Sequence, residues 1–95
     1  MSSEAQTILY AAQSVLTERG KQYGDAAPLF RQMALRFSLV LGIPVTPFTA
    51  ARLMAELKNP RLDLAENYLE DSLLDAITYP ALAGAIANGE KTQKD

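Results

Sequence analysis

Two aspartates, Asp71 and Asp75, are the residues of this 95-residue sequence that are best placed to do chemistry. Their spacing of four puts both carboxylates on one face of a helix, one turn apart. Such a pair can hold a hard divalent cation such as Mg²⁺, because Mg²⁺ prefers oxygen ligands. The alternative is the solvated face of a surface helix, since paired acids on exposed helix faces are common. Tyr79 lies one further turn along and flanks the same face.

Two basic residues, Lys58 and Arg61, flank a proline at position 60. Arginine offers a planar fork and lysine a point charge, and both are suited to binding phosphate. The same two side chains could instead neutralise the two aspartates in an ion-pair network. The sequence leaves both interpretations open.

A third polar group comes earlier in the chain, where Arg19 precedes the turn Tyr23-Gly24-Asp25. Gly24 permits a left-handed turn, and Asp25 is well explained as the cap of the helix that follows. Tyr23 could stack on a base, but packing of its ring against the helices is the favoured interpretation. The amides after Asp25 could hold an anion, for which the Asp25 carboxylate would compete.

Histidine and cysteine are both absent from the sequence. Without histidine, catalysis would depend on carboxylates, Lys, Tyr or hydroxyls, with magnesium as the expected cation. Without cysteine, disulfides and thiolate metal sites are excluded, and a cytoplasmic location fits. The net charge of −2 argues against a nucleic acid polymer as partner. No apolar run approaches the roughly 20 residues that span a bilayer, so we expect no membrane partner.

The spacing of apolar residues predicts an all-α protein of four helices. Gly20 and Gly42 are expected to end the first two helices. Thr46-Pro47 is a start signal for the third, with a hydroxyl cap followed by proline at the first helical position. The predicted ranges are 4–19, 26–41, 47–58 and about 64–87.

The last two predicted boundaries depend on proline and capping signals. Asn59-Pro60 should end the third helix, because the residue before a proline is pushed out of the helical region. Asp63 to Glu66 resembles a capping box that begins the fourth helix. Pro80 should bend this helix, and residues 89–95 should form a polar tail after an ordered core of about residues 4–88.

Four short helices with short connections predict a compact antiparallel bundle that forms a single domain over residues 1–95. The apolar stripes on the second and third helices are wide. Their width predicts that one face meets another subunit in a homo-oligomer. The alternative is that the two stripes face each other within one chain.

The ordered pattern of motifs resembles a family of small phage and prophage domains, and more distantly the all-helical MazG-type nucleotide pyrophosphohydrolases. The resemblance covers about residues 15–86 and implies a helical bundle, often dimeric or larger, with a nucleotide-related pocket between helices. MazG-type enzymes hold magnesium with Glu-x-x-Glu on one helix and Glu-x-x-Asp on the next. The pattern here is Arg19-x-x-x-Tyr23-Gly24-Asp25, then Lys58-x-x-Arg61, then Asp71-x-x-x-Asp75-x-x-x-Tyr79.

This sequence departs from the MazG-type pattern, because only Asp71, Asp75 and Glu56 can stand in for the four acids. The first hypothesis is a nucleotide-binding protein that hydrolyses a nucleoside triphosphate to monophosphate and pyrophosphate, with these three acids holding magnesium and the two aspartates as catalytic residues. The second is a non-enzymatic phage accessory or anti-defence protein in the host cytoplasm, which binds a host protein or sequesters a nucleotide signal. The expected ligand-binding residues are Lys58, Arg61, Tyr23, Arg19 and Tyr79.

Overall fold

The computed structural model describes residues 3–93, apart from the side chains of residue 23 and of residues 90–93. Within this range the chain forms four helices and no strand, so the all-α prediction is confirmed. None of the helices in this range is long and apolar enough to cross a membrane. The helices are α1 (Ser3–Tyr23), α2 (Ala27–Leu41), α3 (Pro47–Leu64) and α4 (Glu70–Gln93).

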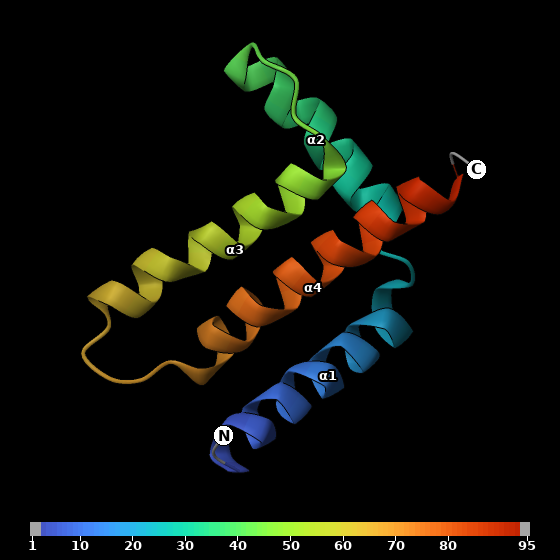
Figure 1. Ribbon diagram of the computed structural model, residues 1–95. Coiled ribbons are helices and arrows are strands. Elements are labelled where there is room, and N and C mark those ends of the chain that lie inside the picture. The colour runs from blue at the N-terminus through green and yellow to red at the C-terminus, as the bar shows by residue number, and fades with distance from the viewer. Residues whose placement is uncertain (1–2, 94–95) are drawn as a thin grey trace.

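The helix α4 lies between α1 and α3 (Figure 1). The helices α3 and α4 are antiparallel and share the most extensive interhelical contact, whereas α1 lies along the other side of α4 and runs in the same direction. The helix α2 packs against α3 near one end of this layer and extends beyond it. The bundle is therefore built around α4, which contacts α3 on one side and α1 on the other.

A glycine with a left-handed backbone separates α1 from α2. Gly24 has φ +74°, and its N–H donates to the carbonyl of Gly20 at 2.9 Å. The prediction that Gly20 ends α1 is wrong, because a helix tolerates glycine at a penalty of about 1 kcal/mol and ends where a positive φ is adopted. The N-cap residue of α2 is Ala26, not the predicted Asp25, and no side chain caps this helix. The Asp25 carboxylate instead accepts a hydrogen bond from the Ala27 N–H at 3.0 Å, in the turn just before α2.

The end of α2 and the start of α3 follow the predicted local signals. Gly42 has φ +71° and donates its N–H to the Ser38 carbonyl at 2.9 Å. The chain then turns back along α2, where Ser38 Oγ accepts the Val45 N–H at 2.8 Å. Thr46 Oγ1 accepts the Thr49 N–H at 3.1 Å and caps α3. The predicted end of α2 at Gly42 and the predicted start of α3 at Thr46 are both confirmed. Each boundary could be predicted from the sequence because it depends on hydrogen bonds between near neighbours.

The predicted break at Asn59-Pro60 is wrong, because α3 continues to Leu64. A proline inside a helix removes one backbone hydrogen bond and destabilises the helix by about 3 kcal/mol. The Asn59 side chain donates to Glu56 Oε2 at 3.1 Å in the turn just before this proline. Packing of α3 along α4 supplies the remaining stabilisation, which the sequence pattern alone does not reveal.

The predicted start of the fourth helix is also wrong. Asp63 lies in the last turns of α3, and α4 begins only at Glu70. The helix stays continuous across Pro80 and past Gly89 to Gln93. The bend at Pro80 stays a prediction, and residues 94–95 of the predicted tail lie outside the described residues.

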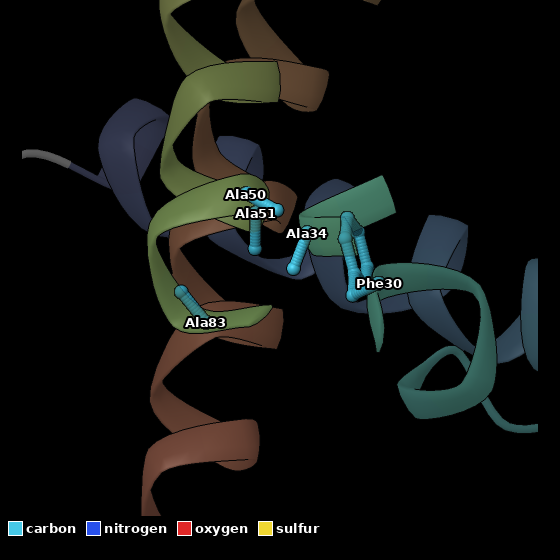
Figure 2. Packing of buried hydrophobic residues seen from close by; sticks show 5 residues of the cluster. All are labelled: Phe30, Ala34, Ala50, Ala51 and Ala83. Carbon is cyan, nitrogen blue, oxygen red and sulfur yellow. The ribbon is translucent and has the colours of Figure 1, made fainter. Parts of the chain in front are cut away.

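Small side chains dominate the centre of the bundle, where α2, α3 and α4 meet (Figure 2). Larger residues that are only partly buried surround this centre. Alanine lets helix backbones approach closely, so the core depends on close packing rather than on bulky side chains. The central cluster consists of Phe30, Ala34, Ala50, Ala51 and Ala83.

Replacing Ala51 with leucine should lower the free energy of unfolding by about 1–3 kcal/mol, because added methylene groups have no space in a closely packed core. Ala51 is fully buried, whereas Ala81 on α4 is exposed. The matched variant Ala81→Leu should change the free energy of unfolding by less than about 0.5 kcal/mol. Urea unfolding followed by circular dichroism measures both, and equal effects would contradict the close packing.

Candidate functional site

One carboxylate joins three helices, since Asp75 of α4 contacts Arg19 of α1 and Lys58 of α3. Arg19 Nη2 lies 2.6 Å from Asp75 Oδ1, and Lys58 Nζ lies 3.1 Å from Asp75 Oδ2. The side chains of Asp75 and Lys58 are 14% and 17% exposed, so water screens their pairing less than it screens surface pairs. We call these three residues the Asp75 triad.

The pKa of Asp75 reflects two opposing effects. Burial on its own would raise the pKa, but the hydrogen bonds and positive charges of Arg19 and Lys58 more than offset burial. The pKa therefore lies below its ordinary value of 3.8. At neutral pH the carboxylate is ionised, and each of its oxygens faces a cation.

The other two acids of the predicted magnesium site lie elsewhere. Asp71 is exposed on α4, and Glu56 is exposed on α3, where it accepts the hydrogen bond from Asn59. Across residues 3–93 no three acidic, histidine or cysteine side chains gather as a group that could hold a metal ion. The acids as placed do not fit a magnesium site, and Asp75 would have to release a cation to join one. Magnesium stays a prediction, and we derive no step through it.

A cavity of about 540 Å³ opens beside Arg19, where the end of α1, the turn after it and α4 come together. This volume falls within the roughly 300–1,000 Å³ of small-molecule sites. We call it the Arg19 cavity. Its lining residues are Leu16, Arg19, Gly20, Gly24, Asp25, Ala26, Leu29, Phe30, Tyr79 and Leu82.

The wall of the Arg19 cavity is aliphatic and aromatic, with one cation and one anion among its residues. The rings of Phe30 and Tyr79 meet edge to face, with centroids 6.2 Å apart. Arg19 is 42% exposed and can reach a ligand, while Asp25 offers carboxylate oxygens beside the start of α2. Such a lining suits a flat, partly apolar molecule that carries a negative group at one end.

Some of the residues singled out from the sequence come together and others do not. Arg19 and Tyr79 line the Arg19 cavity. Lys58 does not line it, but pairs with Asp75, which in turn contacts Arg19. Arg61 is exposed on α3 and, like the two remaining acids, does not line this cavity. The side chain of Tyr23 lies outside the part of the chain that the structure describes.

Sequence reasoning missed the apolar wall of the cavity. Phe30 falls on the apolar stripe of the second predicted helix and does lie in the core, but it also borders the cavity, and Leu29 had no assigned role. A signal existed for two members of this wall. Leu16 precedes Arg19 by three positions, and Leu82 follows Tyr79 by three, so each pair shares a helix face. No comparable signal exists for Leu29.

These features define a class: a small all-α domain with a ligand-sized cavity next to an ion-paired carboxylate that ties three helices. Residues 7–87 match the family described as a domain of unknown function (DUF6378), and the chain belongs to this family. None of the curated proteins and none of the solved structures matches the chain. The matched residues include the lining of the Arg19 cavity and the Asp75 triad.

The variant Asp75→Asn should lower the free energy of unfolding by about 2 kcal/mol at pH 7, because it leaves Lys58 and Arg19 without their anion. A carboxylate with a lowered pKa stabilises the fold fully above its ordinary value of 3.8. This stabilisation is lost as the pH falls from 3.8 through the folded pKa. Urea unfolding at pH 7 and pH 3 should therefore show the difference between wild type and variant shrinking in acid.

The matched control is Asp71→Asn, which removes an exposed carboxylate one turn earlier on the same helix. This change should alter the free energy of unfolding by less than about 0.5 kcal/mol. A loss at Asp71 as large as that at Asp75, or a difference at Asp75 that persists at pH 3, would contradict the role of the triad.

Proposed function

We propose that this protein binds a nucleotide in the Arg19 cavity, with the base against the apolar wall and the phosphates toward Arg19. The observation that carries the proposal is a ligand-sized cavity whose lining combines the ring of Tyr79 and aliphatic side chains with a partly exposed guanidinium. A nucleotide needs both features, because its base is a flat apolar ring and its phosphates are anionic.

The charges around the cavity set the orientation of the ligand. Asp25 would repel phosphates, so its carboxylate is suited instead to accept hydrogen bonds from an amino group or a ribose hydroxyl. Arg19 contacts Asp75 through Nη2, and its guanidinium carries further N–H donors for a phosphate. Lys58 stays beside Asp75 and keeps this carboxylate neutralised when a phosphate draws on Arg19.

Hydrolysis is the further step in this proposal and demands more of the site. It would require Asp71, Asp75 and Glu56 to gather around a metal ion, whereas Asp71 and Glu56 are exposed on separate helices and Asp75 is paired with two cations. The distant relationship to phage-type MazG-like pyrophosphohydrolases is supported by the ordered motifs. A protein that binds without turnover would instead sequester its nucleotide, and in either case we place it in the cytoplasm, where nucleoside triphosphates are found.

Glycine amides provide a direct test of where a nucleotide binds. Titration of ¹⁵N-labelled protein with each nucleoside triphosphate should shift the amide signals of Gly20 and Gly24, which line the Arg19 cavity. The signal of Gly42, at the end of α2, should stay in place. The proposal is abandoned if no triphosphate in the panel shifts the first two signals.

A leucine at Gly20 should weaken this binding at least about tenfold by filling the cavity. Gly20 lies within α1, and a Cβ added there meets no heavy atom within 4 Å, so the fold accepts the change. Gly84→Leu is the matched control, because Gly84 is also helical with an open Cβ position but lines a different hollow with Phe48. Equal dissociation constants for the two variants would move the ligand out of the cavity.

Pyrophosphate release separates the enzyme from a binding module. The wild-type protein is incubated with magnesium and the triphosphate that shifts Gly20, and released pyrophosphate is measured with time. If turnover occurs through the proposed residues, Asp75→Asn should reduce its rate at least about 100-fold. Binding with no release of pyrophosphate would establish sequestration and remove hydrolysis from the proposal.

A further inference from the structure

We propose that the outer part of α2 is the contact surface of a two-fold symmetric dimer of this chain. We call residues 35–43, which end α2 and begin the turn after it, the α2 arm. Figure 1 shows α2 extending beyond the layer formed by the other helices. Five large apolar side chains of the arm are more than half exposed: Leu35, Leu39, Val40, Leu41 and Ile43.

All of the α2 arm except its first two residues, Leu35 and Arg36, belongs to a stretch without charge. Residues 37–51 contain no Asp, Glu, Lys or Arg, and Arg36 and Arg52 border the stretch on either side. Charged residues are depleted from the buried centres of protein interfaces, whereas arginine is enriched in interfaces. An exposed apolar surface that lacks charge is therefore expected to be covered by a partner.

The surface area of the chain supports a partner of substantial size. A monomeric protein of 10.3 kDa is expected to expose about 5,400 Å², whereas this chain exposes 7,088 Å². The radius of gyration of 14.7 Å likewise exceeds the roughly 12.4 Å expected for 95 residues. The excess of about 1,700 Å² is more than the roughly 800 Å² that each partner buries in a standard interface, and it suits an obligate dimer.

The composition of the core gives the same indication from inside the molecule. Most of the buried apolar residues in the described chain are alanines, and Phe30 and Leu74 are the larger ones. Small domains with few large buried side chains commonly gain stability by oligomerisation. The core of one chain has few large buried side chains, so a partner that stabilises it has to be available whenever the chain folds. A second copy of the same chain is always available.

The charge pattern also favours a second copy over an unrelated protein. In a two-fold symmetric dimer the same patch lies on both sides of the interface. A charged patch would therefore repel its copy on the other chain, whereas an uncharged patch would not. In an antiparallel α2–α2 pair centred on Leu39, Arg36 would lie beside the end of the partner's helix. The last turn of α2 contains no basic residue of its own, so a cation from the partner chain would stabilise the negative end of the helix dipole there.

The helix geometry identifies which face meets the partner. At about 100° per residue, Leu35 and Leu39 lie one turn apart on the face of α2 that points away from Phe30 and Ala34. Phe30 and Ala34 are buried in the core. One face of α2 is thus used inside the chain, and the opposite face supplies the contact between chains.

Sedimentation equilibrium of the full chain between about 1 and 100 μM tests this proposal. The wild-type protein should have twice the chain mass of 10.3 kDa. The variant Leu39→Glu should raise the dissociation constant of the dimer at least about 30-fold, because it places two like charges at the two-fold axis. Leu64→Glu is the matched control, since Leu64 is 85% exposed and Leu39 is 83% exposed, and it should remain a dimer.

A cysteine substitution gives a second readout that does not depend on weakening the dimer. The sequence has no cysteine, so Leu39→Cys introduces a single thiol. Oxidation should link two chains through position 39, because residues on the axis of such a pair come within disulfide distance. A wild-type monomer at 100 μM, a dimer that survives Leu39→Glu, or equal cross-linking through Leu64→Cys would each overturn the proposal.

Discussion

The ionised carboxylate of Asp75 is the interaction on which the arrangement of this protein depends. It holds Arg19 on one side and Lys58 on the other, so the position of α1 relative to the α3–α4 pair is tied to a single partly buried charge. The helix α1 buries few side chains of its own, with Ala12 as its buried apolar residue. Because α1 also forms one side of the Arg19 cavity, the shape of the candidate ligand site follows from the same contact.

The helix ends show which parts of the fold are determined by residues close together in the sequence. Gly42 and Thr46 were placed correctly because capping depends on hydrogen bonds within a few residues, whereas the end of α1 was assigned to Gly20 and lies at Gly24. The continuation of α3 through Pro60 was not foreseen, since it depends on packing against another helix, α4, which local rules do not take into account. Local rules indicate that a proline destabilises a helix interior. Whether the helix continues through the proline depends on whether tertiary contacts offset this loss of free energy.

The candidate site was predictable in part for a related reason. A spacing of four places Asp71 and Asp75 on one helix face, but the rotation of α4 against its neighbours leaves the first exposed and turns the second toward two cations. The sequence left open whether Lys58 would meet a phosphate or an aspartate, and the structure pairs it with Asp75. The apolar wall around Phe30 was hidden because a cavity wall and a core have the same residue types.

A double-mutant cycle between positions 19 and 75 measures whether the pair of Arg19 and Asp75 holds α1 in place. The free energy of unfolding is measured for the wild type, Arg19→Gln, Asp75→Asn and the double variant at neutral pH. The account predicts a favourable coupling free energy of at least about 1 kcal/mol between the two side chains. A coupling below about 0.3 kcal/mol would mean that the substitutions act independently, and it would contradict the account.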